Sequence, residues 1–217
     1  MTSLVDFPLF ASCTPQAVAT IAAQGDWRIC APGEQIIQPG QPADAVYALV
    51  QGAVRVLMLD DSGGEVTVKL FAAPAIFGEM ETLLHSHFIG SVEVIDRAHV
   101  VVFSERVFTK ILETYPPVMK NLLLDVCRRF RVSALNEGYL AFRSVEQRLA
   151  SLVLSYARVF GVAVTSGIQI CARDFRQDEL ARGVAASRKS VQRTFHKWQE
   201  MGLLHRQGTA YVMTDLA

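Results

Sequence analysis

The stretch Ser187-Arg-Lys-Ser-Val-Gln-Arg-Thr-Phe-His-Lys-Trp198 predicts a helix with two different faces. Its large apolar side chains fall at i, i+4 and i+7, and so share one side: Val191, Phe195 and Trp198. Its long hydrogen-bond donors share the other side: Arg188, Lys189, Gln192 and Arg193. An α-helix fits the major groove of DNA, where Arg and Lys donate to guanine and Gln pairs with adenine. The pattern favours a DNA-reading helix, and an ordinary solvated basic helix is the alternative.

The flanking residues favour the DNA-reading interpretation. Leu180, Ala181 and Val184 predict a preceding short helix, the small pair Ala185-Ala186 allows a tight turn, and Ser187 is suited to cap the second helix. After Gly202, Leu203–Arg206 and Ala210–Met213 predict a hairpin, the place for a wing that binds a phosphate. With an amphipathic helix over Arg143–Val159, residues 143–217 are predicted to form a winged helix-turn-helix domain.

Composition fits a protein with one basic end. Hydrophobic residues make up 51% of the 217 residues and charged residues 19%, and the formal net charge is +0. From residue 143 onward, however, 11 Lys and Arg stand against 6 Asp and Glu, so only the rear of the chain is expected to meet a polyanion. No apolar run is long enough to cross a membrane, and the N-terminus lacks a signal-peptide pattern, so we expect a cytoplasmic protein.

The N-terminal part of the chain is predicted to form an antiparallel β-roll. Short β-branched runs separated by Gly, Pro and Asp turns predict strands over Val46–Val50, Ala53–Leu59, Val66–Phe71, Ser91–Ile95 and His99–Phe103. No long helix interrupts them, which favours an antiparallel roll over a parallel sheet. We therefore expect an α+β protein whose residues 1–115 form a jelly-roll-like sensor domain.

A long helix is predicted between these two parts, over 116–142. Apolar residues recur along it at steps of three, four and seven: Met119, Leu122, Leu123, Val126, Phe130 and Leu140. Such a stripe must be buried, either on the chain's own barrel or against the same helix of a second copy. Ser133 interrupts the stripe, and polar positions in a paired seam can fix register or line a ligand site.

With these elements in place, the chain resembles the Crp/Fnr family, the cyclic-AMP receptor protein and its relatives. The resemblance rests on Glu179-Leu-Ala181 with Ser187-Arg188, on Val46–Gly52, and on Phe77-Gly-Glu79, in the family's order. It implies a transcription regulator rather than an enzyme, and no Walker loop, G-x-S-x-G, H-E-x-x-H or C-x-x-C motif suggests otherwise. It also implies a homodimer through the Val118–Ala141 helix, double-stranded DNA and RNA polymerase as partners, and no membrane. A regulatory ligand-binding module of a larger assembly is the competing hypothesis.

By the same resemblance, Arg188 and Arg193 would contact bases or phosphates, with Ser187, Lys189 and Gln192 beside them. Two positions depart from the family pattern. Many relatives have Glu after the first Arg of the recognition helix, where it accepts a hydrogen bond from cytosine, and Lys189 cannot accept one. The turn has Ala185 where Gly is usual, which is tolerable if the backbone there is helical or bridging.

The effector cannot be read from the sequence. In nucleotide-binding relatives a Gly-Glu pair holds the ribose and an Arg-Ser pair about ten residues later clamps the phosphate; Gly78-Glu79 matches, but the clamp positions are Ile89-Gly90. A buried phosphate without its guanidinium loses charged hydrogen bonds, so cyclic AMP is disfavoured. The candidate pocket residues are Gly78, Glu79, Phe88, Ile89, Gly90 and Ser133.

The cysteine and histidine residues bear on other possible cofactors. The four cysteines, Cys13, Cys30, Cys127 and Cys171, are scattered, which argues against an iron–sulfur cluster or a zinc site. His85 and His87 could ligate haem, although a polar hairpin tip is the favoured explanation. A small apolar effector is the remaining alternative, because the segment around Phe77–Ile89 is unusually apolar.

Overall fold

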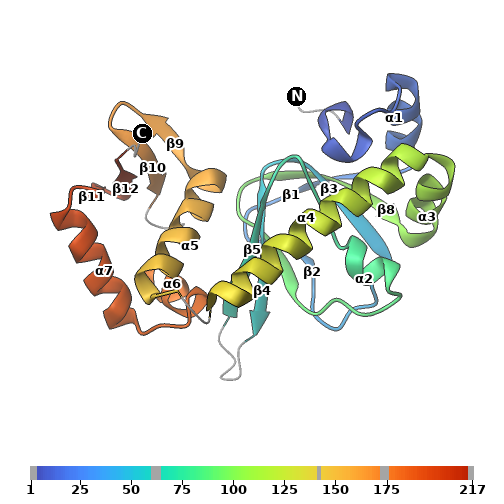
Figure 1. Ribbon diagram of the computed structural model, residues 1–217. Helices are drawn as coiled ribbons and strands as arrows, with labels where there is room; N and C mark the ends of the chain where they lie inside the picture. Colours follow the sequence, from blue (N-terminus) through green and yellow to red (C-terminus); the bar gives the residue numbers. More distant parts are fainter. Residues whose placement is uncertain (1–3, 60–64, 141–142, 172–175, 215–217) are drawn as a thin grey trace. The chain divides into compact units, whose positions relative to one another are not determined.

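The computed structural model describes residues 4–59, 65–140, 143–171 and 176–214, and only the backbone of residues 135–140. The chain forms two compact units (Figure 1). The first unit comprises residues 1–58 and 71–136, and the second comprises residues 59–70 and 137–217. None of the helices among the described residues is long and apolar enough to span a membrane. The domain limits drawn from the sequence, 1–115, 116–142 and 143–217, stay predictions.

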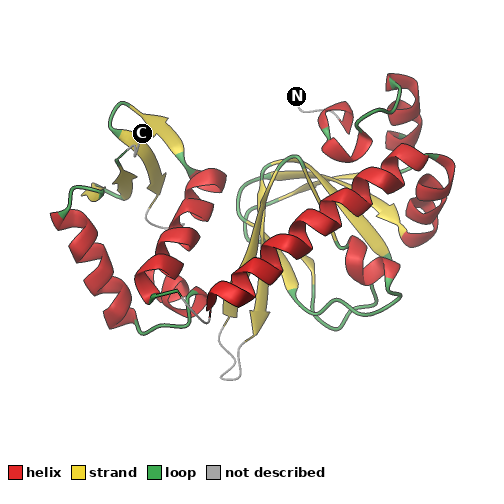
Figure 2. Ribbon diagram, in the orientation of Figure 1, coloured by secondary structure: helices red, strands yellow, loops and turns green. Residues whose placement is uncertain are grey.

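The strands before residue 105 form a β-roll of two four-stranded sheets (Figure 2). One sheet has the order β1-β8-β3-β6 and the other β2-β7-β4-β5, and the described pairings are antiparallel, as predicted. The strands are β1 (Asp26–Cys30), β2 (Gln35–Ile37), β3 (Ala45–Gln51), β4 (Ala53–Leu59), β5 (Glu65–Ala72), β6 (Ala75–Phe77), β7 (Ser91–Val94) and β8 (Ala98–Ser104). The five predicted strands are confirmed, whereas β1, β2 and β6 were missed because they are short or carry little apolar alternation.

Helices cover the outer face of the first sheet. They are α1 (Pro15–Ala22), α3 (Glu105–Thr114) and the start of α4 (Pro116–Leu140), and α2 (Glu79–Leu83) follows β6. Phe108, Ile111 and Val118 are buried in one cluster with Val46 and Val101 of the sheet. The opposite side chains of the same strands, such as Tyr47 and Val100, pack in a second cluster inside the roll. Strand β3 is therefore buried on both faces, and β-branched side chains suit that position.

The long helix α4 matches its prediction in extent but divides its apolar residues between two faces. Val118 and Leu122 are buried against the roll of the same chain. Met119, Leu123 and Phe130 are exposed, the last of them by 73%. The expectation of one common stripe is therefore wrong for Leu122, because an apolar helix lying on its own sheet must bury a second stripe there. The side chain of Leu140 and residue 141 lie outside the described residues.

The second unit contains the winged helix-turn-helix. Its helices are α5 (Val145–Phe160), α6 (Gln177–Gly183) and α7 (Arg188–Glu200), and its sheet has the order β11-β12-β10-β9. The predicted hairpin is confirmed as β11 (Leu204–Gln207) and β12 (Ala210–Met213), but β9 (Val162–Val164) and β10 (Gly167–Cys171) were not predicted. Leu149, Val153, Leu180, Val191 and Phe195 lie in one buried cluster that joins the helices.

Candidate nucleic-acid interface

Helix α7 has the two faces that its sequence predicts. Val191, Phe195 and Trp198 are all buried, with Phe195 tilted against both Trp198 and Tyr211 of the wing at centroid distances of 5.8 and 5.7 Å. Ser187 caps the helix, because its hydroxyl accepts a hydrogen bond from the backbone N–H of Ser190 at 3.1 Å. The burial of one face fixes which side chains stay in solvent.

The five side chains proposed to meet DNA are exposed at and after the start of α7: Ser187, Arg188, Lys189, Gln192 and Arg193. The carboxylate of Asp178, in the first turn of α6, pairs with Nε of Arg188 at 3.2 Å. His196 continues the same exposed face and lies near Glu200 at 3.4 Å. Sequence reasoning missed Asp178 and His196, although the spacing of His196 from Gln192 and Arg193 could have indicated its place.

The turn between α6 and α7 is left-handed at one residue. Ala185 has φ +48°, so the condition that would have made Ala tolerable, a helical or bridging backbone, is not met. A Cβ in this region crowds the following carbonyl, at a cost of about 1–2 kcal/mol. The neighbouring hydrogen bond from the N–H of Ala186 to the carbonyl of Ala181, at 2.9 Å, belongs to the same turn. The turn that sets the α6–α7 angle is therefore strained.

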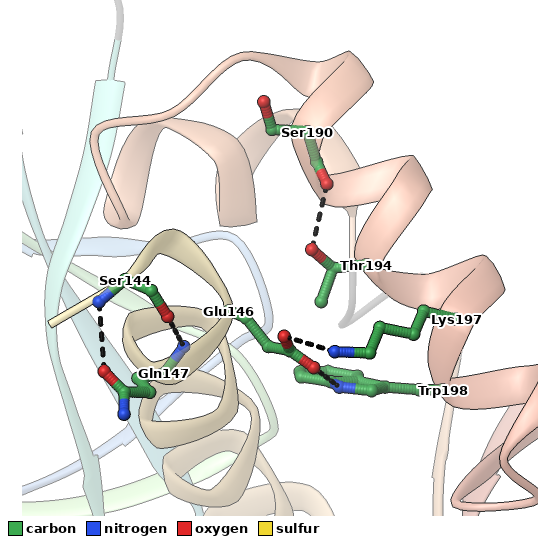
Figure 3. Close-up of polar contacts among 7 residues, drawn as sticks. All are labelled: Ser144, Glu146, Gln147, Ser190, Thr194, Lys197 and Trp198. Carbon is green, nitrogen blue, oxygen red and sulfur yellow. Dashed lines mark hydrogen bonds and ion pairs between the residues drawn. The ribbon is translucent and has the colours of Figure 1, made fainter.

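The N-terminus of α5 fixes the far end of α7 (Figure 3). The carboxylate of Glu146 accepts hydrogen bonds from Nζ of Lys197 at 2.7 Å and from Nε1 of Trp198 at 3.0 Å. These two donors lower the pKa of Glu146. Ser144 and Gln147 form a reciprocal capping box that starts α5 at this point, so the carboxylate is held on a well-ordered first turn.

Helix α6 has its own polar anchor within the second unit. Glu179 accepts hydrogen bonds from the hydroxyl of Tyr156 on α5, at 3.0 Å, and from the hydroxyl of Thr67 on β5. Nε of Arg182 donates to the carbonyl of Glu65 at 2.8 Å. Glu179 of the motif Glu179-Leu-Ala181 therefore anchors α6 to α5 and β5. The sequence alone did not reveal this structural role.

In the sensor unit, the structure brings together three of the six proposed pocket residues. Gly78 caps α2 with φ +82°, and a Cβ there would lie 3.2 Å from the Tyr47 ring and 3.4 Å from Phe88. Glu79 is 1% exposed and Phe88 is buried inside the roll. Burial raises the pKa of Glu79, and the nearby Arg129 opposes this effect.

Arg129 on α4 is the functional candidate that the sequence did not single out. Its guanidinium is ion-paired with Glu79 and lies 3.0 Å, through Nε, from the carboxylate of Asp125 one turn earlier. The second carboxylate oxygen of Glu79 is buried without a hydrogen-bond partner. An acid buried in the roll is thus joined to the long helix by one charged side chain.

The remaining pocket candidates differ from Glu79 in exposure or packing. Ile89 is 69% exposed, and Ser133 is exposed one helical turn beyond Arg129. At Gly90 a Cβ would lie 2.6 Å from the carbonyl oxygen of Leu57, so the backbone of β4 occupies the space that a side chain would need. Glu79 and Phe88 are therefore buried beside Gly78, whereas Ile89 and Ser133 are exposed, and the pocket that these residues would form stays a prediction.

The two histidines considered as haem ligands lie in an exposed turn. His85 has φ +51°, and its Nδ1 is 2.8 Å from the carboxylate of Glu105. His87 is exposed and forms a bridge with Pro42. No three His, Cys, Asp or Glu side chains among the described residues come together as a metal site. A polar turn after α2, held by the contact of His85 with Glu105, accounts for this pair, and their role as haem ligands stays a prediction.

Comparison with known proteins matches both units. Residues 27–115 match the cyclic nucleotide-binding domain, and residues 147–217 match the Crp-like helix-turn-helix domain. The chain belongs to the Crp/Fnr family of transcription regulators. The order of the two domains, roll first and helix-turn-helix last, agrees with the order of the sequence motifs.

Full-length relatives extend the likeness over almost the whole chain. The CRP-like cAMP-activated global transcriptional regulator of Mycobacterium tuberculosis is 23% identical over 207 residues, which cover 95% of this chain and 92% of that protein. The global nitrogen regulator of Synechococcus elongatus is 29% identical over 174 residues, covering 79% and 78%. The solved structure of the c-di-GMP responsive regulator CLP of Xanthomonas campestris has a TM-score of 0.77 at 20% identity, covering 93% and 100%. This Crp/Fnr chain is a regulator and not an enzyme.

The strained turn of this Crp/Fnr regulator yields a stability prediction. Ala185→Gly removes the Cβ from the left-handed position and should raise the free energy of unfolding by about 1 kcal/mol. Urea denaturation followed by circular dichroism measures it. Ala186→Gly, one residue on, is the matched control and should lower the same quantity by about 0.5–1 kcal/mol. Equal losses in both variants would contradict the strain.

The Glu146 anchor yields a pH prediction. In the folded protein the pKa of Glu146 lies below the value of a free glutamate. Its carboxylate therefore stabilises the fold fully when the pH is above the free value, and this stabilisation is lost as the pH falls through the lowered pKa. Glu146→Gln should lower the melting temperature at pH 7 by roughly 1–3 °C, since the group is only partly buried. The difference from wild type should shrink in acid. Glu200→Gln, whose partner His196 is exposed, is the control, and a pH-independent effect of Glu146→Gln would contradict the prediction.

Proposed function

We propose that this protein is a homodimeric, effector-controlled regulator that binds a two-fold-symmetric DNA operator. The observation that carries the proposal is helix α7, in which Val191, Phe195 and Trp198 are buried and the Arg188–Arg193 face is exposed to solvent. A helix of this kind inserts its N-terminal donors into the major groove while the adjacent wing contacts the backbone. The ligand-module hypothesis gives this basic face no role.

The exposed face of α4 supports the homodimer. Met119, Leu123 and Phe130 recur at steps of four and seven and are exposed, although such side chains normally seek burial. Pairing with the same helix of a second copy covers them, and Val126, half-buried beside them, joins the seam. A two-fold dimer then presents two copies of α7 to half-sites about 34 Å apart, one turn of DNA.

The effector is proposed to act through the pair formed by Glu79 and Arg129. This pair joins α2 of the roll to α4, the helix that we assign to the dimer interface. A ligand that enters beside Gly78 and Phe88 and changes the hydrogen bonding of Glu79 would release or hold Arg129, and would thereby move α4. The DNA affinity of the dimer is coupled to the ligand only if the two α4 arrangements bind it differently.

Cyclic nucleotides are disfavoured as this effector. The positions of the phosphate clamp are Ile89, which points into solvent, and Gly90, which lies against the Leu57 carbonyl. Arg129, the basic group near the site, is already engaged by Glu79 and Asp125. A small, mainly apolar effector fits these surroundings better. As a regulator of bacterial genes the protein would act in the cytoplasm and contact RNA polymerase there.

The DNA-binding assignment predicts the effect of two substitutions. Arg188→Ala and Arg193→Ala should each weaken binding to an operator selected from a random-sequence pool by about tenfold or more, because each removes a potential bidentate base contact. Electrophoretic mobility shift at several salt concentrations measures this. Arg158→Ala, an exposed arginine on α5 with the same charge loss, is the control. Wild-type affinity in the double variant, or no salt-dependent binding by the wild type, would refute the function.

The dimer assignment predicts the mass of the native protein. Native mass spectrometry of freshly purified protein should show a dimer, and Leu123→Asp should convert it to a monomer, because a carboxylate cannot be buried unpaired in the seam. Leu154→Asp alters a similarly exposed leucine on α5 and should leave the dimer intact. The same spectra, with an absorption scan, would identify a co-purified effector or a haem. A monomeric wild type would contradict this assignment.

A further inference from the structure

We infer that Asp178 is a specificity-determining residue of this regulator, which positions Arg188 for guanine and away from phosphate. The inference rests on the proposed DNA binding and names one residue that the helix-turn-helix pattern does not supply. It starts from the contact between the Asp178 carboxylate and Nε of Arg188 at 3.2 Å, made from the first turn of α6 to the first residue of α7.

Stability does not explain this pair. The two side chains are 43% and 65% exposed, and ion pairs in solvent contribute about 0–1 kcal/mol. Asp178 also lies in the first turn of α6, where a negative charge is favoured without any partner. The main effect of the contact is therefore on Arg188, which is the first residue of the helix proposed to enter the groove.

The contact uses one edge of a planar group. A guanidinium has five N–H donors in a fixed fork, and Nε carries one of them. With the Nε edge of the guanidinium ion-paired to the Asp178 carboxylate, the two terminal nitrogens at the end of Arg188 remain for an end-on pair of hydrogen bonds. Guanine presents two acceptors, O6 and N7, in the major groove and takes such a pair. Because the side chain is already held at its base, less rotamer freedom is lost on binding.

The carboxylate also disfavours the competing contact. DNA phosphates attract any free arginine and carry no sequence information. A negative charge beside Arg188 reduces that attraction, and a phosphate approaching the guanidinium would also approach Asp178. The base edge of guanine is uncharged and suffers no such repulsion. Asp178 should therefore raise the ratio of specific to non-specific binding.

The Asp178–Arg188 pair also affects how the next residue, Lys189, can contact DNA. Lys189 stands where a cytosine-accepting carboxylate is common in the family, and it has no acceptor. Asp178 does not restore that acceptor from α6, since its carboxylate is paired with Arg188. Arg188 and Asp178 thus read one guanine together, and the position next to it is left to Lys189 and Gln192.

The test compares base preferences and not affinity alone. Operators are selected from a random-sequence pool with the full-length wild type and with Asp178→Asn, Arg188→Ala and Arg188→Lys. We expect a strong guanine preference at one base pair per half-site in the wild type, lost in Arg188→Ala and weakened in Arg188→Lys, because lysine donates to guanine without the planar fork of arginine. Asp178→Asn should reduce the preference at that same base pair by about tenfold, while binding to unselected duplex rises. In the Asp178→Asn/Arg188→Ala double variant, loss of Asp178 should cause no further change in preference.

Glu200→Gln removes one negative charge from the same helix-turn-helix and is the charge control. It should raise binding to unselected duplex without changing any base preference, and circular dichroism checks that each variant is folded. The inference is overturned if Asp178→Asn keeps the wild-type preference, or relaxes a different base pair while Arg188 still reads its own. Failure of the wild type to bind DNA at all is a separate result, which removes the proposed function itself.

Discussion

The burial of Val191, Phe195 and Trp198 is the constraint on which the DNA-binding unit depends. Those three side chains lie in the core shared with Leu149, Leu180 and the wing, so α7 cannot rotate about its axis without exposing them. Full burial of a side chain of this size is worth about 1.5–3 kcal/mol, and three of them fix the rotation of the helix firmly. The arginine face is exposed because the apolar face is not.

Polar contacts fix the position of α7 more closely than the packing of its apolar face does. Glu146 holds the C-terminal half of α7 through Lys197 and Trp198, while Asp178 engages its first residue from α6. Ser187 caps the helix at its start, next to Arg188. Each contact acts on position more than on stability, because the groups involved are at least partly in solvent. A recognition helix has to be placed to within a fraction of an ångström, and these contacts supply that placement.

The sensor unit concentrates its chemistry at one buried acid. Glu79 lies buried at the start of α2, and Arg129 reaches it from α4. A buried charge without a partner is costly, so the folded state depends on the arginine staying in place or on another group replacing it. The Glu79–Arg129 contact is for that reason the most direct route from the roll to the long helix. It uses a residue of α4 that faces the roll, while Phe130 beside it faces solvent.

Much of this was already determined by the sequence, since periodicity alone places residues on faces. The i, i+4, i+7 spacing of α7, the alternation of the long strands and the turn residues specified the helix-turn-helix, the wing hairpin and the antiparallel roll. The short strands β1, β2, β6, β9 and β10 escaped because three to five residues give too little periodicity to distinguish from loop. Tertiary structure alone decided the partition of α4 between buried Leu122 and exposed Leu123, since adjacent apolar residues look equivalent until a sheet covers one side. It alone joined Glu79 to Arg129 and Asp178 to Arg188, because pairing across elements depends on how helices pack and not on spacing along the chain. The left-handed Ala185 belongs with these, for the angle between α6 and α7 is set by their shared core and the turn adopts the backbone conformation that closes it.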